Sequence, residues 1–353
     1  MLSALAVATR LPGASQRELL APEAWKALNR NEPARASALF DDELKRHPEN
    51  AGLHFGAGSA AYAAGRHDTA LSSLRKAVEL DPQFVQAWTM LADVAYERGK
   101  SELAIGSLEK AAALRPRDRG VSDTLERWRR ESSTHGSYLE RPTGHFRILY
   151  EGVRTQAIGD RVARVLEREY QRIGRALQKF PSEPITVMLY TNREFQDLTR
   201  APGWAAGSYD GRIRVAVGGS ASEGDLDRVV THELVHAVIA TAGRVPAWLN
   251  EGLATHLEST DPGWATATLR RSAAIMPLAD LVRGFSGFDE QQAVVAYAES
   301  AVAAEVLIAQ LGSNLGPFLE MVGRGSSVDQ ALLEFHVQPN AFEAEWARRT
   351  GVR

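Results

Sequence analysis

The feature that most constrains the fold is a repeat with a period of 34 residues in the first third of the chain. Seven residues show it: Tyr62, Gly65, Ala70, Leu74, Ala77, Leu80 and Pro82 recur as Tyr96, Gly99, Ala104, Leu108, Ala111, Leu114 and Pro116. Ala36, Phe40 and Pro48 lie one period earlier and mark a more divergent first repeat. Small residues let antiparallel helices approach closely, and each proline ends the second helix of a pair. The pattern therefore predicts a stack of helix pairs.

This pattern resembles the tetratricopeptide repeat, which has the same period. The resemblance implies an all-α solenoid of three repeats at residues 17–118, preceded by an N-terminal segment at 1–16. Such arrays commonly bind a peptide or protein on their concave surface, and the alternative is a spacer or a support for the fold. The geometry of the repeat would line this groove with Phe55, Ser59, Tyr62, Gln86, Thr89, Asp93 and Tyr96.

Composition narrows the classes of partner and of metal ligand. The chain has 353 residues and a net charge of -3, which gives no general attraction for nucleic acid. It contains no cysteine, so a metal ion would have to be bound by His, Asp or Glu. The start, M-L-S-A-L-A-V-A-T-R, is a short apolar run with no positive charge ahead of it. We therefore expect no signal peptide and no membrane span, and a soluble protein of the cytoplasm or periplasm.

A second domain is predicted at residues 145–353, after a helical extension and linker at 119–144. H-F-R-I-L-Y and R-I-R-V-A-V alternate with the period of a strand, and P-I-T-V-M-L-Y is rich in branched and aromatic residues. Residues 155–180 have the period of an amphipathic helix. Strands mixed with long helices indicate an α+β domain.

The most specific motif is T-H-E-L-V-H at residues 231–236. On a helix, His232 and His236 lie on the same face, while Glu233 is about 100° around the axis. This spacing can hold a zinc ion with a carboxylate beside it, and the alternative is a surface helix with two solvated histidines. Glu251 follows in W-L-N-E-G-L-A on a second predicted helix and could be a third ligand.

H-E-L-V-H, W-L-N-E-G-L-A and a later Y-A-E-S together resemble the gluzincin metallopeptidases, over about residues 145–312. The resemblance is closest to the peptidase MA-like domains that often accompany tetratricopeptide repeats. It implies one zinc ion per chain, bound by His232, His236 and Glu251, with the fourth position left for water. The second domain is therefore expected to have a zincin-like fold.

The same resemblance implies further site residues. Glu233 would be the general base. Tyr297 would donate a hydrogen bond to the developing oxyanion, although a tyrosine packed in the core fits the sequence equally well. The strand before the active helix would be a sheet edge that pairs with extended substrate, so that the binding residues are Arg212, Ile213, Arg214, Val215, Ala216 and Val217. Gly218 and Gly219 would leave room beside it.

Two differences from related enzymes bear on activity. Gluzincins often carry an acidic residue four positions after the third ligand, which orients a zinc-binding histidine, and here that position is Thr255. Whether such a site is fully active is left open by the sequence. The glycine- and glutamate-rich stretch with which related aminopeptidases hold a free amino terminus is also missing, which favours an endopeptidase.

The sequence thus predicts a zinc-dependent peptidase that hydrolyses a peptide or protein substrate, with repeats that recruit a partner or the substrate. The main alternative is a scaffold whose repeats bind a partner and whose second domain keeps zinc for structure or has lost turnover. Metal-assisted hydrolysis of a non-peptide amide is a third hypothesis, which the sequence neither supports nor excludes.

Overall fold

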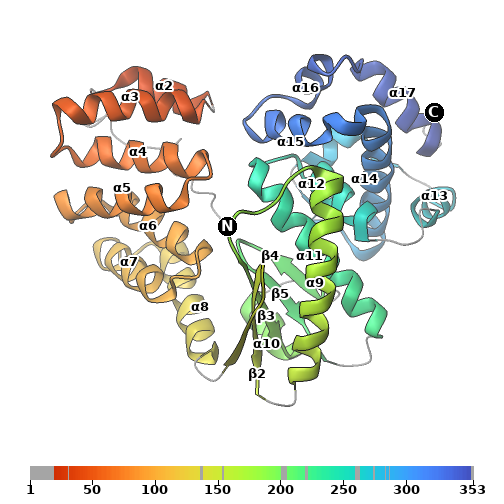
Figure 1. The fold of residues 1–353 in the computed structure, drawn as a ribbon, viewed down its shortest axis with the longest axis horizontal. Coiled ribbons are helices and arrows are strands. Elements are labelled where there is room, and N and C mark those ends of the chain that lie inside the picture. Colours follow the sequence, from red (N-terminus) through yellow and green to blue (C-terminus); the bar gives the residue numbers. More distant parts are fainter. Residues whose placement is uncertain are drawn as a thin grey trace. The chain divides into compact units, whose positions relative to one another are not determined.

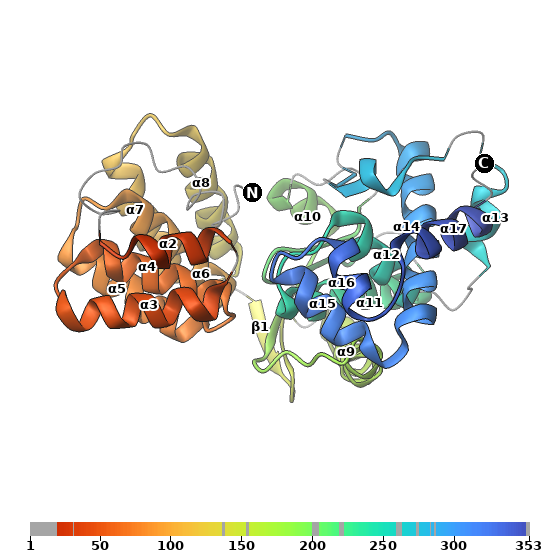
Figure 2. The same cartoon turned by 90° about the horizontal axis from the view of Figure 1, so that it is seen from above.

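Contacts divide the chain into two units, with the boundary between Ser137 and Tyr138 (Figures 1 and 2). The computed structural model describes residues 20–350 except 31, 136–137, 153–154, 200–204, 219–221, 259–262, 273–274, 283 and 286. The predicted segment at 1–16 and the first residues of the predicted solenoid, 17–19, lie outside the described residues.

The N-terminal unit is a succession of helices, each of which packs on the next in the chain. They are α2 (Pro22–Asn29), α3 (Pro33–Arg46), α4 (Ala51–Ala63), α5 (His67–Leu80), α6 (Val85–Glu97), α7 (Ser101–Leu114) and α8 (Arg119–His135). Gly65 and Gly99, which follow α4 and α6, have φ values of 73° and 69°. Only glycine adopts this left-handed backbone without strain, which explains why both repeats have glycine at this position. The predicted all-α solenoid is confirmed.

Helix α8 continues the pattern of the repeats beyond the predicted end at residue 118. Tyr62 donates a hydrogen bond to Glu97 at 2.7 Å, and Tyr96 donates the equivalent bond to Glu131 on α8. Trp128 also stacks on Tyr96, with ring centroids 4.1 Å apart and an interplanar angle of 7°. Because partners 35 residues apart meet in the same way twice, α8 takes the place of the first helix of a further repeat.

The C-terminal unit contains a five-stranded sheet in the order β1-β2-β3-β5-β4. Its strands are β1 (Tyr138–Pro142), β2 (Phe146–Glu151), β3 (Ile185–Tyr190), β4 (Gly207–Tyr209) and β5 (Ile213–Ala216). Strands β2, β3 and β5 are parallel, while β1 and β4 are antiparallel to their neighbours and form the two edges. The segment predicted as an extension and linker therefore holds two regular elements, α8 in the first unit and β1 in the second. Its many Ser, Thr, Gly and Pro residues concealed β1 in the sequence.

Nine α-helices accompany the sheet in the part of this unit that is described. They are α9 (Gln156–Leu177), α10 (Asn192–Thr199), α11 (Glu223–Ile239), α12 (Ala247–Glu258), α13 (Trp264–Leu269), α14 (Glu290–Leu311), α15 (Leu315–Gly323), α16 (Val328–Glu334) and α17 (Pro339–Thr350). Helix α10 packs on one face of the sheet, where Phe195 and Leu198 contact Met188 and Tyr190.

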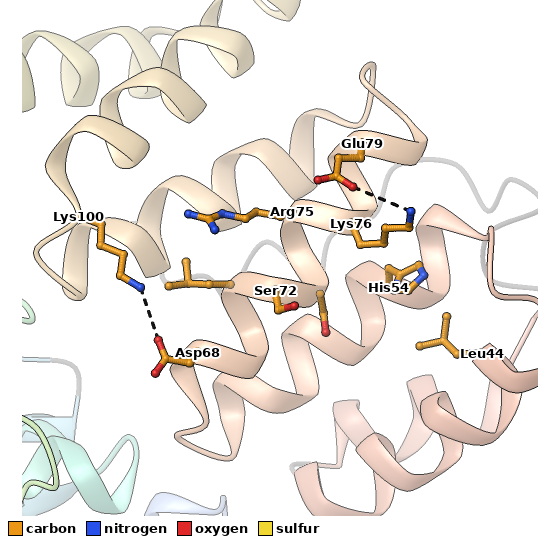
Figure 3. Close-up of a pocket in the computed structure, with 10 residues that line it drawn as sticks. Leu44, His54, Asp68, Ser72, Arg75, Lys76, Glu79 and Lys100 are labelled. Carbon is orange, nitrogen blue, oxygen red and sulfur yellow. Dashed lines mark ion pairs between the residues drawn. The ribbon is translucent and has the colours of Figure 1, made fainter.

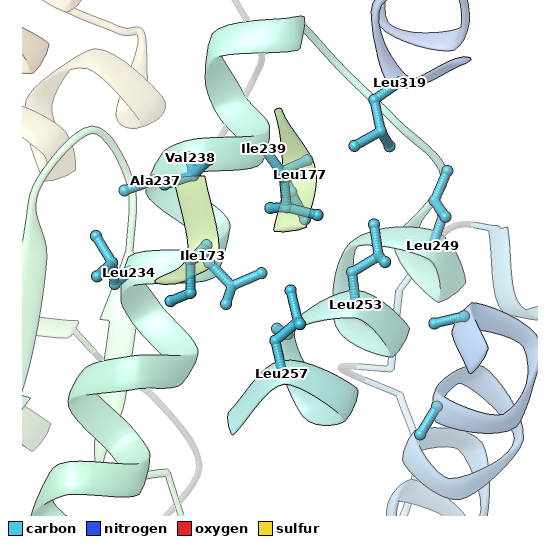
Figure 4. Packing of buried hydrophobic residues seen from close by; sticks show 14 of the residues in the cluster. Ile173, Leu177, Leu234, Ala237, Val238, Ile239, Leu249, Leu253, Leu257 and Leu319 are labelled. Atoms are coloured by element: carbon cyan, nitrogen blue, oxygen red, sulfur yellow. The ribbon is translucent and has the colours of Figure 1, made fainter. Parts of the chain in front are cut away.

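The main core lies where α9, α11 and α12 meet (Figure 4). Figure 4 shows leucine, isoleucine and valine side chains that the three helices contribute to this core: Ile173, Leu177, Leu234, Val238, Ile239, Leu249, Leu253 and Leu257. Truncating one such leucine to alanine typically costs about 2–5 kcal/mol. Arg161 of α9 adds a bidentate ion pair with Asp227 of α11, at 2.8 and 3.0 Å. These contacts fix how α11 and α12 cross.

Helix α14 is the long central helix of this unit. The stretch Glu290–Gly323 is long and apolar enough to cross a membrane, but 67% of its apolar window is buried inside the unit. A buried core helix of this composition passes the same test of length and hydropathy. Gly252 of α12 lies against it, since a Cβ atom there would be 2.2 Å from the backbone oxygen of Ser300. A side chain at this position would force the two helices apart.

Glu299 on α14 is fully buried. The backbone N–H of Met276 donates a hydrogen bond to its Oε1 at 2.6 Å, while Oε2 has no hydrogen-bond partner among the described residues. Burial raises the pKa of this carboxyl to about 7.

We expect Glu299→Gln to stabilise the protein at high pH. The carboxyl has its ordinary pKa of 4.5 in the unfolded chain and a pKa of about 7 in the folded one, so stability falls as the pH rises through this interval. Unfolding in urea should show the variant more stable at pH 8, by about 3 kcal/mol, and equal to wild type near pH 4. The exposed Glu290, substituted in the same way, is the control. Equal stability at pH 8 contradicts this account.

Candidate metal centre

Helix α11 presents its two histidines to one point. It begins with a capping box, in which Ser222 and Asp225 each accept a hydrogen bond from the other's backbone N–H. His232 and His236 are one helical turn apart, with ring centroids separated by 4.6 Å and planes at 85°. The Nε2 atom of each ring faces Glu251, which α12 brings from the other side.

The distances among these three side chains fit a shared metal ion. Oε2 of Glu251 lies 3.4 Å from Nε2 of His232 and 3.5 Å from Nε2 of His236, and the three ligand atoms all lie within 4.8 Å of one another. Two ligands of a tetrahedral zinc ion with bonds of about 2.0–2.1 Å are about 3.3–3.4 Å apart. The side chains are only 16%, 10% and 22% exposed. Two imidazoles and a carboxylate are also a typical donor set for zinc.

The three candidate ligands shift one another's pKa values. Burial raises the pKa of Glu251, but the positive charge of His236 and contact with His232 outweigh burial and hold the pKa far below its ordinary value. Burial lowers the pKa of His232 and His236, yet the nearby carboxylates outweigh it and raise both. The carboxylates thus draw positive charge to the place where a metal cation would supply it.

Glu233 is the buried carboxylate beside these ligands. It is 6% exposed, and its Oε2 has no hydrogen-bond partner in the described part of the chain. Burial raises its pKa above the ordinary value. A buried carboxylate oxygen without a partner is costly, which marks Glu233 as a candidate for a functional role.

Comparison with known families agrees with this geometry. The sequence model of the peptidase MA superfamily matches residues 170–348, about half of the chain, and that of the tetratricopeptide repeat matches residues 22–83 and 60–119. The chain belongs to the peptidase MA superfamily. It carries tetratricopeptide repeats ahead of the peptidase MA domain, as the sequence predicted.

Solved tetratricopeptide structures are similar to the N-terminal unit. The first such domain of Spaghetti (RPAP3) bound to an HSP90 peptide has 17% identity, and the match covers 34% of this chain and 96% of that one at a TM-score of 0.32. The first domain of human RPAP3 has 20% identity, with 36% and 100% covered and a TM-score of 0.32. The Sgt2 domain from Aspergillus fumigatus has 22% identity, with 37% and 88% covered and a TM-score of 0.32. No curated protein is similar enough to the chain to match it.

Tyr297 lies beside the candidate metal centre of this peptidase MA domain. Its ring centroid is 6.4 Å from that of His232, and the ring of Phe285 packs edge-on against it at 5.1 Å. Burial raises the pKa of Tyr297 far above its ordinary value, and the charges of Glu251 and Glu233 raise it further. The hydroxyl therefore keeps its proton and can donate a hydrogen bond at neutral pH.

The prediction that residues 212–217 form an edge strand of the sheet is wrong. Residues 213–216 form β5, which lies between β3 and β4, so both sides of its backbone are already paired. All of the residues predicted to bind substrate except Ala216 are buried: Arg212, Ile213, Arg214, Val215, Ala216 and Val217. The alternating pattern of β5 identified a strand, but the pattern does not show whether another strand pairs with it on its outer side. Gly218 precedes α11 and is exposed, while Gly219 lies outside the described residues.

The edge strand beside α11 is β4, a strand of only three residues. Gly207 of β4 touches the predicted base, since a Cβ atom there would be 2.6 Å from Oε1 of Glu233 and 2.8 Å from Cγ1 of Val229. Only glycine lets the strand approach this closely. Sequence analysis missed Gly207, although A-A-G-S-Y could have been recognised as a short strand before the turn at Asp210-Gly211.

Helix α12 supplies a second carboxylate that sequence analysis missed. Nδ1 of His232 lies 2.6 Å from Oε2 of Glu258, at the end of α12. Thr255, at the position where an acidic residue was expected, is 3% exposed, and its hydroxyl has no partner among the described residues. The sequence did offer a signal for Glu258, because it lies two helical turns after Glu251. Considering acidic residues in the second turn as well as in the first would have identified it.

The expected groove of the repeats is partly filled by the protein itself. Phe55, Ser59 and Tyr96 are buried, because Phe55 packs on Phe84 at 4.9 Å, Ser59 bonds to the backbone of Phe55 and Tyr96 stacks on Trp128. The positions that stay partly exposed are Tyr62, Gln86, Thr89 and Asp93. Burial raises the pKa of Asp93 to about 7.

A separate surface pocket of about 620 Å³ lies on the N-terminal unit around α5 (Figure 3). Two of its basic side chains pair with acidic ones, Lys100 with Asp68 at 3.5 Å and Lys76 with Glu79 at 4.0 Å (Figure 3). Exposed pairs of this kind contribute little to stability. The pocket contains none of the predicted metal ligands.

Proposed function

We propose that the C-terminal unit is a zinc-dependent endopeptidase, and that the repeats recruit its substrate or a partner protein. The observation that carries this proposal is the convergence of His232, His236 and Glu251, with Oε2 of Glu251 3.4–3.5 Å from the two Nε2 atoms. Next to them lies the buried carboxylate of Glu233, whose Oε2 has no hydrogen-bond partner among the described residues. A scaffold with a purely structural ion does not need a buried base beside it.

Each residue has a distinct part in this chemistry. His232, His236 and Glu251 would hold the ion, which when bound supplies a Lewis acid for the scissile carbonyl and lowers the pKa of water. Glu233 accepts the proton that the attacking water loses and passes it to the leaving nitrogen. Tyr297, which keeps its proton, donates a hydrogen bond to the developing oxyanion.

Substrate binding is assigned to the edge strand β4. An extended peptide can add to an exposed edge through backbone hydrogen bonds, and β4 brings such an edge to Glu233. Gly207, Ser208 and Tyr209 carry no carboxylate with which to hold a free amino terminus, which supports an endopeptidase.

The repeats have a polar surface on which a partner could bind. Gln86, Thr89 and Asp93 of α6 remain accessible beside Tyr62 of α4, and all four carry polar groups. Such a surface suits an extended polar segment better than the apolar face of a helix.

The decisive experiment separates metal binding from hydrolysis. We expect Glu233→Gln to retain one zinc ion per chain while hydrolysis falls about 10² to 10⁴-fold, because the general base is lost. His236→Ala should lose the zinc itself. His256, which lies outside the cluster on α12, is the control and should keep zinc and activity as alanine. The measurements are zinc content after dialysis and mass-spectrometric profiling of a broad peptide library. A wild-type protein that binds zinc yet cleaves no peptide would favour the scaffold.

Substitution of Gly207 by alanine tests the contact between β4 and the base. The added methyl group would overlap Oε1 of Glu233, so either the base or the strand must move. A misplacement of about 1 Å can cost about 10²-fold in rate, and we expect a loss of this size in kcat/KM with zinc content unchanged. Ser208→Ala on the same strand is the control. Unchanged kcat/KM for Gly207→Ala would remove β4 from the site.

A further inference from the structure

Glu258 is held between two side chains of the neighbouring helix. It is the last residue of α12, and its side chain is 10% exposed. Oε2 lies 2.6 Å from Nδ1 of His232, and Oε1 lies 3.1 Å from Nη1 of Arg228. Because Arg228 and His232 are four residues apart on α11, one face of that helix contacts both carboxylate oxygens.

The backbone that carries Glu258 is also fixed. Nη2 of Arg172, on α9, donates a hydrogen bond to the backbone oxygen of Leu257 at 2.6 Å. The side chain of Leu257 is part of the main core. The last turn of α12 is therefore anchored on both sides, and the carboxylate cannot leave His232 without breaking other contacts.

The two histidines of the cluster differ in their outer contacts. Nδ1 of His232 has Glu258, whereas Nδ1 of His236 is buried and has no hydrogen-bond partner in the part of the chain that the structure describes. The hydroxyl of Thr255 is also buried, and no described residue forms a hydrogen bond with it. Among the described residues, the imidazole of His232 is therefore held at both ring nitrogens, and that of His236 is held at Nε2 alone.

We propose that Glu258 is the positioning residue of the metal centre, with Arg228 as its clamp. By accepting a hydrogen bond from Nδ1–H of His232, Glu258 selects the tautomer that leaves Nε2 free to bind the ion. Arg228 donates a hydrogen bond to the second oxygen and thereby restricts rotation of the carboxylate. This inference rests on the proposed zinc site and transfers the orienting role from position 255 to position 258.

Zinc affinity of purified full-length protein is the main test, measured by competition with a chelator. We expect Glu258→Ala to weaken zinc binding about 10 to 100-fold, the usual cost of losing such an outer partner. Glu258→Gln should weaken it less, because the amide oxygen can still accept the bond. Arg228→Met should lie between wild type and Glu258→Ala. Glu290→Gln, an exposed carboxylate on α14, is the control and should equal wild type.

A second readout distinguishes positioning from a general loss of structure. In the zinc-loaded wild type, the Nδ1 proton of His232 should give a slowly exchanging, downfield NMR signal that disappears in Glu258→Ala. Unfolding temperatures of the metal-free forms check that the variants fold. Equal zinc affinity of wild type and Glu258→Ala, or a downfield signal that persists, overturns the proposal. A wild type that binds no zinc instead contradicts the proposed function itself.

Discussion

The site depends on how α11 crosses α12. Buried aliphatic side chains such as Leu234, Leu253 and Leu257 fix this crossing, and it brings two imidazoles of one helix to a carboxylate of the other at 3.4–3.5 Å. Removing these groups from water costs free energy that apolar packing must offset. The same packing keeps the carboxylate of Glu233 buried beside the ligands. A shift in the crossing would alter the metal centre, its base and its orienting carboxylate together.

Features that depend on local geometry could be predicted from the sequence. The 34-residue period needs only the rise and turn of helix pairs, and it predicted the solenoid. His232 and His236 share a face of α11 because a helix places residues four apart on the same side. Glu251 followed from a motif on the next helix. The period and the shared helix face need no distant partner, whereas the approach of Glu251 to the two histidines depends on the crossing of α11 and α12.

Features set by distant contacts could not be predicted in this way. The pattern of β5 identified a strand, but only its pairing with β4 shows that Arg212 to Val217 are not at the edge. The position of Glu258 follows from the crossing of two helices. Its separation from Glu251 by two turns makes it a candidate in the sequence, but only the structure shows that it reaches His232. The burial of Phe55 likewise results from Trp25 and Phe84, which lie in other helices. Such contacts depend on how separate elements pack together, which local sequence patterns do not show.

The proposed peptidase requires a single cation held by two imidazoles and one carboxylate. Zinc K-edge X-ray absorption of the protein loaded with one equivalent of zinc tests it most directly. We predict a four-coordinate ion with two imidazole nitrogens and oxygen ligands at about 2.0–2.2 Å. A six-coordinate ion without imidazole scattering would contradict the assignment of His232 and His236, and with it the proposed peptidase.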